Sequence, residues 1–431
     1  MHDELTKRAA ASAEGVARRR SIAAGVVGNF VEFFDWTIYA YMAPVFAAQI
    51  FPADTPSVSL LLAFSTFAVG YVARPLGALV FGIYADRIGR RNALTLTILL
   101  TAAGSLAVAC APTYGTVGMA APALVLFARV LQGFAAGGEG GSAQAYLTEL
   151  GRSTKRAFTA SLQQVSTGLS TLFALALSTY LTHTLSGEQM DAFGWRLPFF
   201  LGSLLGLAGV YLRRHASESK VFLAQHGGKP VLKNLAHEWR ALLLVTGVAL
   251  FPSTVYFAWQ IYLPTYIVAA AGLTRDAALM ISTVGLVCFV LLIPPAALLS
   301  DRYGRKPMLI GYTLAALLWG YPTFIGLHSF AASFEGALIV AVVGNVILAV
   351  MSGSLIACMT ELFTTAVRAT GAGLAYAAAI VISGASFPPL VTLLLANRRY
   401  GTILAYFSVI GAISLVAYLV MPETRLRRIA D

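Results

Sequence analysis

Apolar stretches of about 20 residues recur along the whole chain, and clusters of Gly, Pro and charged residues separate them. A stretch of that length spans the ~30 Å hydrocarbon core of a membrane when it folds as an α-helix. The pattern therefore predicts an all-α membrane protein with twelve transmembrane helices. The expected helices cover residues 22–50, 57–84, 92–111, 117–147, 157–183, 194–213, 239–270, 276–299, 307–327, 335–362, 368–395 and 401–421.

Composition agrees with this pattern. Of the 431 residues, 58% are hydrophobic and only 11% are charged, and the mean hydropathy is +0.75. A soluble domain of this size needs far more charged residues to cover its surface. Cys110, Cys288 and Cys358 are scattered without CxxC spacing, and the six histidines lack metal-ligand spacing. We therefore expect no disulfide framework and no metal site, and the polar N-terminus predicts no cleavable signal peptide.

The net charge of +11 would suggest nucleic-acid binding in a soluble protein. Here the Lys and Arg residues gather before the first apolar segment and in every second loop after it. The intervening loops hold only Arg196, Arg275, Arg398 and Arg399. By the positive-inside rule, both termini are predicted to be cytoplasmic. The basic charge thus sets topology and meets anionic lipid headgroups, and it gives no support to nucleic-acid binding.

The chain also repeats. GIYADRIGRR (82–91) and LLSDRYGRK (298–306) each follow an apolar segment, and their aspartates Asp86 and Asp301 lie 215 residues (301 − 86) apart, half the chain length. We predict two six-helix halves, a parallel repeat found among transporters. The expected domains are an N-terminal cytoplasmic segment (1–21), the first half (22–213), a cytoplasmic central loop (214–238), the second half (239–421) and a cytoplasmic tail (422–431).

Two carboxylates interrupt the first apolar segment in the stretch GNFVEFFDW (28–36). At 100° per residue, Glu32 and Asp35 lie on one face of a helix near mid-membrane. A charged carboxylate there costs at least ~2.5 kcal/mol unless it is paired or hydrated. Each acid is therefore either a structural partner in an ion pair or hydrogen bond, or a group that couples transport to proton uptake. Glu32 is the better candidate for the proton.

Deep arginines are the counterparts of these acids. Arg129 lies in RVLQGFAAGGEGG, and its forked guanidinium suits bidentate recognition of a carboxylate. Gln132, one turn on, can add a neutral hydrogen bond. Arg74, beside Pro75, is equally deep, and it either binds an anionic substrate or braces the first helix. The alternative to a substrate or coupling role for Arg129 is that of a fixed ion-pair partner of Glu32, Asp35 or Glu139. Glu139 is either a coupling or gating acid or a structural partner of a loop arginine.

The same segment carries Gly133, Gly137 and Gly141 at intervals of four residues. Small residues at this spacing let two helix backbones approach closely in a membrane. No lysine follows in the spacing of a phosphate-binding loop, so we interpret the glycines as packing positions.

Other segments offer neutral polar groups. Breaks at Pro252 and Pro264 can open the seventh helix, and broken helices near a central site suit alternating access. Each such polar group can instead serve interhelical packing. The candidates for substrate binding are Gln164 on the fifth predicted helix, Tyr256 and Gln260 on the seventh and Tyr376 on the eleventh.

The repeated loop resembles a known family signature. Gly82, Asp86, Arg87, Gly89, Arg90 and Arg91 match the loop between helices 2 and 3 of the major facilitator superfamily. The second copy keeps Asp301, Arg302, Gly304, Arg305 and Lys306 but has Ala297 where the first glycine would be. The resemblance implies the major facilitator fold. It also implies that the aspartates receive helix-end donors or a guanidinium when the cytoplasmic side is closed. The candidate gating residues are Asp86, Arg87, Gly89, Arg90, Arg91, Asp301, Arg302 and Arg305.

Further motifs narrow the resemblance. GNFVEFFDW, ARPLG (73–77), RVLQGFAAGGEGG (129–141), GWRLPF (194–199) and ELFTTAVRATGAGLAY (361–376) are similar to the metabolite:proton symporter family, although Thr364 stands where members often carry proline. That family includes permeases for 2-oxoglutarate, citrate, shikimate and proline/betaine. The resemblance implies proton-coupled import of a small organic anion, with a di- or tricarboxylate as the first expectation, across the inner membrane. It implies no cofactor, and the proton gradient is the driving force.

Other functions stay open at this point. A zwitterionic osmolyte and a shikimate-like monocarboxylate are alternative substrates. An enzyme is disfavoured because the sequence shows neither a compact nucleophile–base pair nor HExxH, and a receptor would bind its ligand without flux. We expect the partners to be the organic anion, protons and membrane lipid, and the functional unit to be a monomer.

Overall fold

The computed structural model describes residues 28–425, apart from residues 89, 139, 142–143, 145–146, 149–153, 215–234, 236 and 365–366. Regular structure within this part of the chain is entirely helical, beginning with a helix over residues 28–50. The α-helices that follow are α2 (Pro56–Val72), α3 (Arg74–Ile88), α4 (Arg90–Ala109), α5 (Tyr114–Val117), α6 (Ala120–Gly137), α8 (Arg156–Thr184), α9 (Gly187–Ala192), α10 (Leu197–Arg214), α13 (Trp239–Tyr256), α14 (Leu263–Ala271), α15 (Arg275–Tyr303), α16 (Arg305–Phe324), α17 (Phe334–Ser352), α18 (Leu355–Glu361), α19 (Arg368–Ala379), α20 (Phe387–Ala396) and α21 (Tyr400–Val420).

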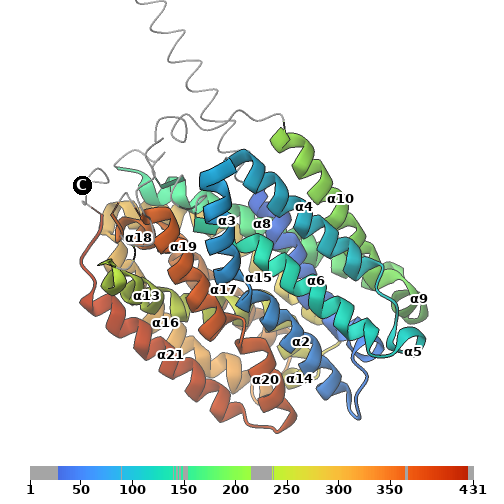
Figure 1. Ribbon diagram of the computed structural model, residues 1–431. Coiled ribbons are helices and arrows are strands. Elements are labelled where there is room, and N and C mark those ends of the chain that lie inside the picture. Colours follow the sequence, from blue (N-terminus) through green and yellow to red (C-terminus); the bar gives the residue numbers. More distant parts are fainter. Residues whose placement is uncertain are drawn as a thin grey trace, which may run out of the picture.

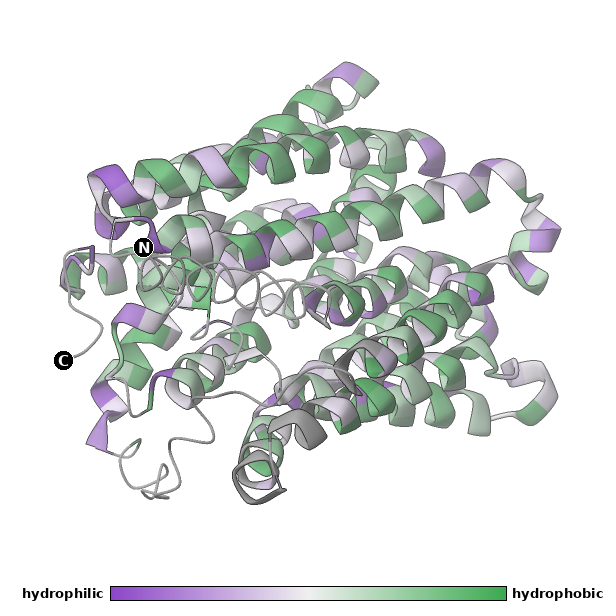
Figure 2. Ribbon diagram, turned by 90° about the horizontal axis from the view of Figure 1, so that it is seen from above, coloured by the Kyte–Doolittle hydropathy of each residue, from purple (hydrophilic) through white to green (hydrophobic). Residues whose placement is uncertain are grey.

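Each of the twelve apolar segments expected from the sequence overlaps helical residues. In the described part of the chain, nine helices are long and apolar enough to cross a membrane. Large apolar side chains such as Leu76, Phe127 and Leu318 are exposed on their outer faces, where lipid would cover them. Figure 2 shows hydrophobic residues along the lengths of the helices and hydrophilic residues gathered at the ends.

The helices form two groups. Figure 1 shows the blue to green helices of the first half on one side and the yellow to red helices of the second half on the other. The groups meet where α8 packs against α15 and where α2 and α3 pack against α20 and α19. Residues between two such groups are those that a relative movement of the halves would uncover.

Proline positions explain where the long helices change geometry. Pro75 has no N–H to donate to the carbonyl of Tyr71, and α2 ends at Val72 before α3 begins. The seventh predicted helix consists of α13, a π-helical segment over Phe257–Tyr262, and α14. Pro264 removes the donor that the Gln260 carbonyl would normally receive. That carbonyl instead accepts a hydrogen bond from the Tyr41 hydroxyl of the first helix.

Close backbone packing fixes α6 against α2 and α3. A Cβ atom on Gly133 would lie 1.7 Å from the carbonyl oxygen of Gly70, and one on Gly137 would lie 2.0 Å from the carbonyl oxygen of Arg74. Only glycine fits at these two positions, so the predicted packing role of the glycine repeat is confirmed there. The contact also fixes the backbone from which the Arg74 side chain extends.

A third glycine brings the two halves together. A Cβ atom on Gly141 would lie 2.2 Å from the carbonyl oxygen of Ala369 and 2.9 Å from the Cα atom of Gly373. Because Gly373 belongs to α19, this contact joins the end of the fourth predicted helix to the eleventh. It lies at the border of the pocket described below.

Candidate functional site

Glu32 forms an ion pair with Arg74, through Oε1 and a terminal guanidinium nitrogen. Both residues are 7% exposed. The guanidinium also lies over the rings of Tyr71 and Trp36, at 4.7 and 5.1 Å from their centroids. Ion pairing and ring contacts together compensate the desolvation of a charge held deep in an apolar bundle.

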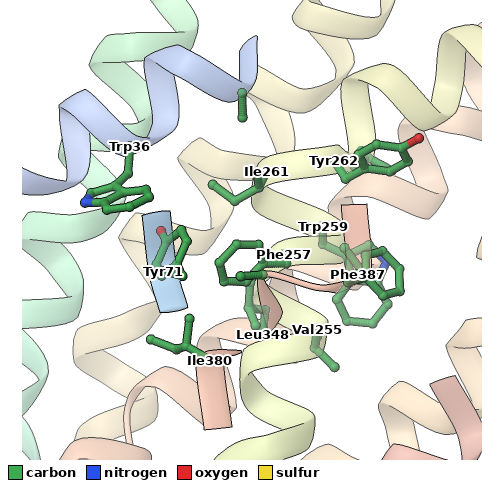
Figure 3. Close-up of a cluster of buried hydrophobic side chains, with 14 of the residues drawn as sticks. Trp36, Tyr71, Val255, Phe257, Trp259, Ile261, Tyr262, Leu348, Ile380 and Phe387 are labelled. Carbon is green, nitrogen blue, oxygen red and sulfur yellow. The ribbon is translucent and has the colours of Figure 1, made fainter. Parts of the chain in front are cut away.

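The aromatic contacts continue across the interface of the halves. Trp36 packs on Tyr71 with ring centroids 4.0 Å apart, and Tyr71 meets Phe257 of the second half at 5.4 Å. Figure 3 shows these three rings following one another, with Trp259, Tyr262 and Phe387 beyond them. The Arg74 guanidinium therefore lies beside an aromatic junction that would have to rearrange when the halves move.

Asp35 forms a second ion pair one turn further along the first helix. Its Oδ2 lies 3.1 Å from a terminal nitrogen of Arg129, and its Oδ1 accepts a hydrogen bond from Ser105. Gln132 Nε2 donates to Ser105 Oγ at 3.1 Å. Asp35 is 1% exposed and Arg129 is 0% exposed. This pair is therefore shielded from water more completely than Glu32 and Arg74.

Arg129 does not reach the pocket. Its guanidinium lies 4.5 Å from the ring centroid of Tyr39 and 5.4 Å from that of Trp36, and neither Arg129 nor Gln132 is among the pocket-lining residues. The arrangement is the fixed ion pair that the sequence left open as an alternative to substrate binding. A substrate role for Arg129 and Gln132 stays a prediction that requires another conformation.

A pocket of about 520 Å³, including its open mouth, lies between the two halves. The Glu32–Arg74 pair lies in its wall, and the predicted candidates Gln164 and Tyr376 line it from opposite halves. The described lining residues are Asn29, Glu32, Phe33, Arg74, Ala136, Gly137, Gly140, Gly141, Gln144, Gln163, Gln164, Ile356, Gly373, Tyr376 and Ala377.

Amide and hydroxyl groups of the first and fifth predicted helices bond directly to one another. Asn29 Nδ2 donates to Thr167 Oγ1 at 2.9 Å and to the backbone carbonyl of Gln163 at 3.3 Å. Gln163 Nε2 in turn donates to Asn29 Oδ1 at 3.3 Å. These bonds hold the Gln163 side chain at the pocket wall.

Tyr256 and Gln260, the candidates on the seventh helix, are not pocket-lining residues. The Tyr256 hydroxyl lies 3.3 Å from Thr171 Oγ1 of α8, across the interface of the halves. Gln260 Nε2 donates to Asn345 Oδ1 on α17. Asn345 was missed by the sequence reasoning. The signal in the sequence was that Asn345 is the one amide in the apolar run GALIVAVVGNVILAVM.

Three of the predicted gating residues, Asp301, Arg302 and Arg305, lie in the described part of the chain. Asp301 accepts hydrogen bonds from the backbone N–H groups of Ala157 and Phe158, each at 3.0 Å, at the start of α8. Arg305 lies 3.1 Å from Asp301, and Arg302 lies over the ring of Tyr303 at 5.5 Å. Asp301 thus caps a helix of the opposite half, as expected for a closed end. The side chains of Asp86, Arg87, Arg90 and Arg91, and residues Gly89 and Glu139, lie outside the described residues.

The same end holds an acid that the sequence reasoning missed. Glu361 forms a bidentate contact with Arg305, at 3.2 and 3.3 Å, and lies 3.9 Å from Arg156 of the first half. Next to it, Thr360 Oγ1 donates to Thr148 Oγ1 at 3.0 Å, also between halves. A signal was present, because the triplet TEL occurs at 148–150 and again at 360–362.

Apolar outer faces, two helical halves, and a buried ion pair in the wall of a pocket shared by those halves define a multi-pass membrane transporter. The comparisons agree. The family model of the Major Facilitator Superfamily matches residues 25–293, and that of "Sugar (and other) transporter" matches residues 229–431. The chain belongs to the major facilitator superfamily, whose members are transporters rather than enzymes, and the family expected from the sequence motifs is confirmed.

Characterised relatives cover most of the chain. It is 35% identical to the citrate-proton symporter of Salmonella typhi over 85% of each chain. It is 33% identical to the alpha-ketoglutarate permease of Escherichia coli, over 94% of this chain and 93% of the relative. It is 30% identical to the proline/betaine transporter of Salmonella typhimurium, over 94% and 84%.

A crystal structure of the D-xylose-proton symporter superposes with a TM-score of 0.75 at 17% identity, covering 94% of this chain and 98% of that one. A partially occluded, inward-open structure of the xylose transporter XylE from E. coli gives 0.74, also at 17% identity. At this identity, the likeness establishes the fold alone.

Proposed function

We propose that this chain is a proton-coupled symporter that imports a small organic acid by alternating access, with di- and tricarboxylates such as citrate and 2-oxoglutarate as the leading candidates. The names of two relatives, a citrate-proton symporter and an alpha-ketoglutarate permease, support this substrate class. The proton gradient across the inner membrane is the driving force in this proposal. The proposed functional unit is a monomer.

The observation that carries the proposal is the Glu32–Arg74 pair in the wall of the pocket. While Glu32 is ionised, it holds the guanidinium. A proton on Glu32 removes that negative charge, so Arg74 becomes available to a substrate carboxylate. Binding of the proton and binding of the anion thereby support each other, which is the thermodynamic requirement for symport.

The second pair has a different role in this proposal. Asp35 and Arg129 are enclosed by Ser105, Tyr39 and Trp36, away from the pocket. An ion pair buried this completely exchanges protons slowly with either side. We assign it to holding the first helix against α4 and α6, whereas Glu32 carries the transported proton.

Alternating access needs contacts that form and break between halves. The capping of α8 by Asp301 and the Glu361–Arg156 contact close one end of the bundle. Toward the other end, the Tyr41 hydroxyl bonds the Gln260 carbonyl, and Arg275 donates to the Tyr41 carbonyl at 2.8 Å. Opening either end requires breaking one of these sets.

Uptake into proteoliposomes tests the function. Labelled citrate and 2-oxoglutarate should accumulate when an inward acid gradient is imposed, and accumulation should stop when a protonophore collapses that gradient. Glu32→Gln should abolish accumulation yet retain exchange of labelled for unlabelled substrate, because exchange does not require net proton movement. Uptake that ignores the gradient would remove the coupling, and unchanged accumulation by the variant would make Glu32 structural.

A zwitterionic osmolyte is the second candidate. The pocket wall presents both a carboxylate and a guanidinium, which could meet the cationic and anionic ends of such a substrate, and one relative is a proline/betaine transporter. A shikimate-like monocarboxylate would pair its single carboxylate with Arg74. Competition by proline, glycine betaine and shikimate against labelled citrate uptake ranks these alternatives.

A further inference from the structure

The wall of the pocket carries a hydrogen-bond acceptor for which the described residues supply no donor. Gln163 is 6% exposed and lines the pocket, and its Oε1 has no hydrogen-bond partner among the described residues. Gln144 also lines the pocket and is 2% exposed, and its Oε1 likewise has no hydrogen-bond partner among the described residues. Buried polar atoms are normally satisfied, so unpaired atoms beside a pocket indicate what a ligand supplies.

The local bonds determine which end of the Gln163 amide is unpaired. The backbone carbonyl of Gln163 can only accept a hydrogen bond, so the end of the Asn29 amide that lies 3.3 Å from it is Nδ2, and Oδ1 is the other end. Asn29 Oδ1 in turn needs a donor, and it is Gln163 Nε2. Gln163 Oε1 is therefore the unpaired atom of this amide, and as an acceptor it can be satisfied only by an O–H or N–H group.

Charge limits what else the ligand carries. Among the described lining residues, Arg74 is the sole cation and Glu32 is the sole anion. One guanidinium matches one carboxylate. The remaining polar side chains of the lining are amides and the phenol of Tyr376, and these groups suit hydrogen bonds to neutral groups. An ionised carboxylate has only acceptor atoms, so it cannot satisfy Gln163 Oε1.

We propose that the substrate is a small hydroxy acid, in which one carboxylate pairs with Arg74 and a hydroxyl donates to Gln163 Oε1. This inference rests on the proposed function and narrows its substrate class. It favours acids that carry a hydroxyl group, among them citrate and shikimate, over 2-oxoglutarate, which carries none. Gln163 is then a specificity-determining residue, distinct from the charged pair that handles the proton.

Matched ligand pairs test the proposal with the purified full-length chain. Malate and succinate, 2-hydroxyglutarate and 2-oxoglutarate, and citrate and propane-1,2,3-tricarboxylate each differ at the hydroxyl position. We expect the hydroxy acid of at least one pair to bind about tenfold tighter or more, because its counterpart leaves a buried acceptor unpaired. Glycine betaine, a carboxylate without any donor, should not bind.

Two variants locate the effect. Gln163→Met keeps the side-chain length and removes the acceptor, so the preference for the hydroxy acid should fall to about twofold or less. Ser282→Ala is the control, since Ser282 Oγ is also buried and has no partner among the described residues but lies outside the pocket lining. It should leave the preference ratio unchanged. If Gln163→Met fails to fold, the ligand pairs on the unaltered protein decide the question alone.

The outcomes separate the inference from the function on which it rests. Binding of the hydroxyl-free acids as tightly as their partners in every pair, or tight binding of glycine betaine, overturns the hydroxy-acid proposal and leaves organic-anion transport standing in the first case. Failure of every acid to bind or to be transported overturns both. A preference that survives Gln163→Met shows that another group reads the hydroxyl.

Discussion

Replacing one member of the Asp35–Arg129 pair leaves the other charge buried alone. Asp35 is 1% exposed and Arg129 is 0% exposed, so neither can recover its hydration without local opening. Breaking a buried pair by removing one partner costs about 3–5 kcal/mol of stability. Asp35→Asn and Arg129→Met should each lower the free energy of unfolding by that amount. The hydrogen bond from Ser105 to Asp35 moderates the effect of Arg129→Met.

The double variant Asp35→Asn/Arg129→Met removes both charges together. Its loss of stability should be smaller than the sum of the two single losses, by an interaction energy of about 1–3 kcal/mol in the double-mutant cycle. The four proteins are compared by SDS titration in mixed micelles, with intrinsic fluorescence as the readout, and by their melting temperatures in detergent.

Arg302→Gln serves as the control, because Arg302 is an exposed arginine on the same chain and its loss should change stability by no more than about 0.5 kcal/mol. The reasoning is refuted if the two single losses simply add in the double variant. It is also refuted if Asp35→Asn abolishes proton coupling while leaving stability unchanged, since that result would assign the proton to Asp35.

Three further perturbations test other contacts. Gly133→Ala places a Cβ atom 1.7 Å from the Gly70 carbonyl oxygen and should destabilise the chain by about 1–3 kcal/mol or prevent folding, whereas Gly115→Ala meets nothing within 4 Å and should be neutral in the same melting assay. Asp301→Asn weakens the cap on α8, so spin-label distances between the halves at that end should shift toward the open state, and unchanged distributions would contradict a gating role. Tyr41→Phe leaves the Gln260 carbonyl unpaired; we expect a loss of about 1–3 kcal/mol in stability, and an unchanged melting temperature would show that water replaces the hydroxyl.

The sequence predicted an all-α membrane protein from the lengths of its apolar segments, because a membrane leaves few ways to satisfy backbone hydrogen bonds, and it predicted the two halves of the major facilitator fold from the repeated loop and its family resemblance. It also predicted the close packing at Gly133 and Gly137, since helix contacts of this kind need small residues at one spacing. The membrane-spanning segments and the glycine packing can both be predicted because each depends only on the sequence within a single helix.

Partners between helices were harder to predict. Helical phase places Glu32 and Asp35 on one face, but it does not say that Arg74 meets the first and Arg129 the second. Which arginine each acid meets depends on how the first helix, α3 and α6 are positioned along their axes relative to one another. The glycine contacts set such relative positions in the folded structure. Asn345 was missed because its partner, Gln260, lies on another helix.

The matching of two buried acids with two buried arginines also determines how the carrier responds to the membrane potential. Moving one elementary charge through 100 mV costs ~2.3 kcal/mol. Glu32 with Arg74 and Asp35 with Arg129 sum to zero charge, so these four groups add no voltage dependence when the empty carrier reorients. One proton taken up with one monoanion keeps that sum at zero. Any difference between the number of protons and the negative charge of the substrate makes the step electrogenic, and the current per transported molecule would then report the stoichiometry directly.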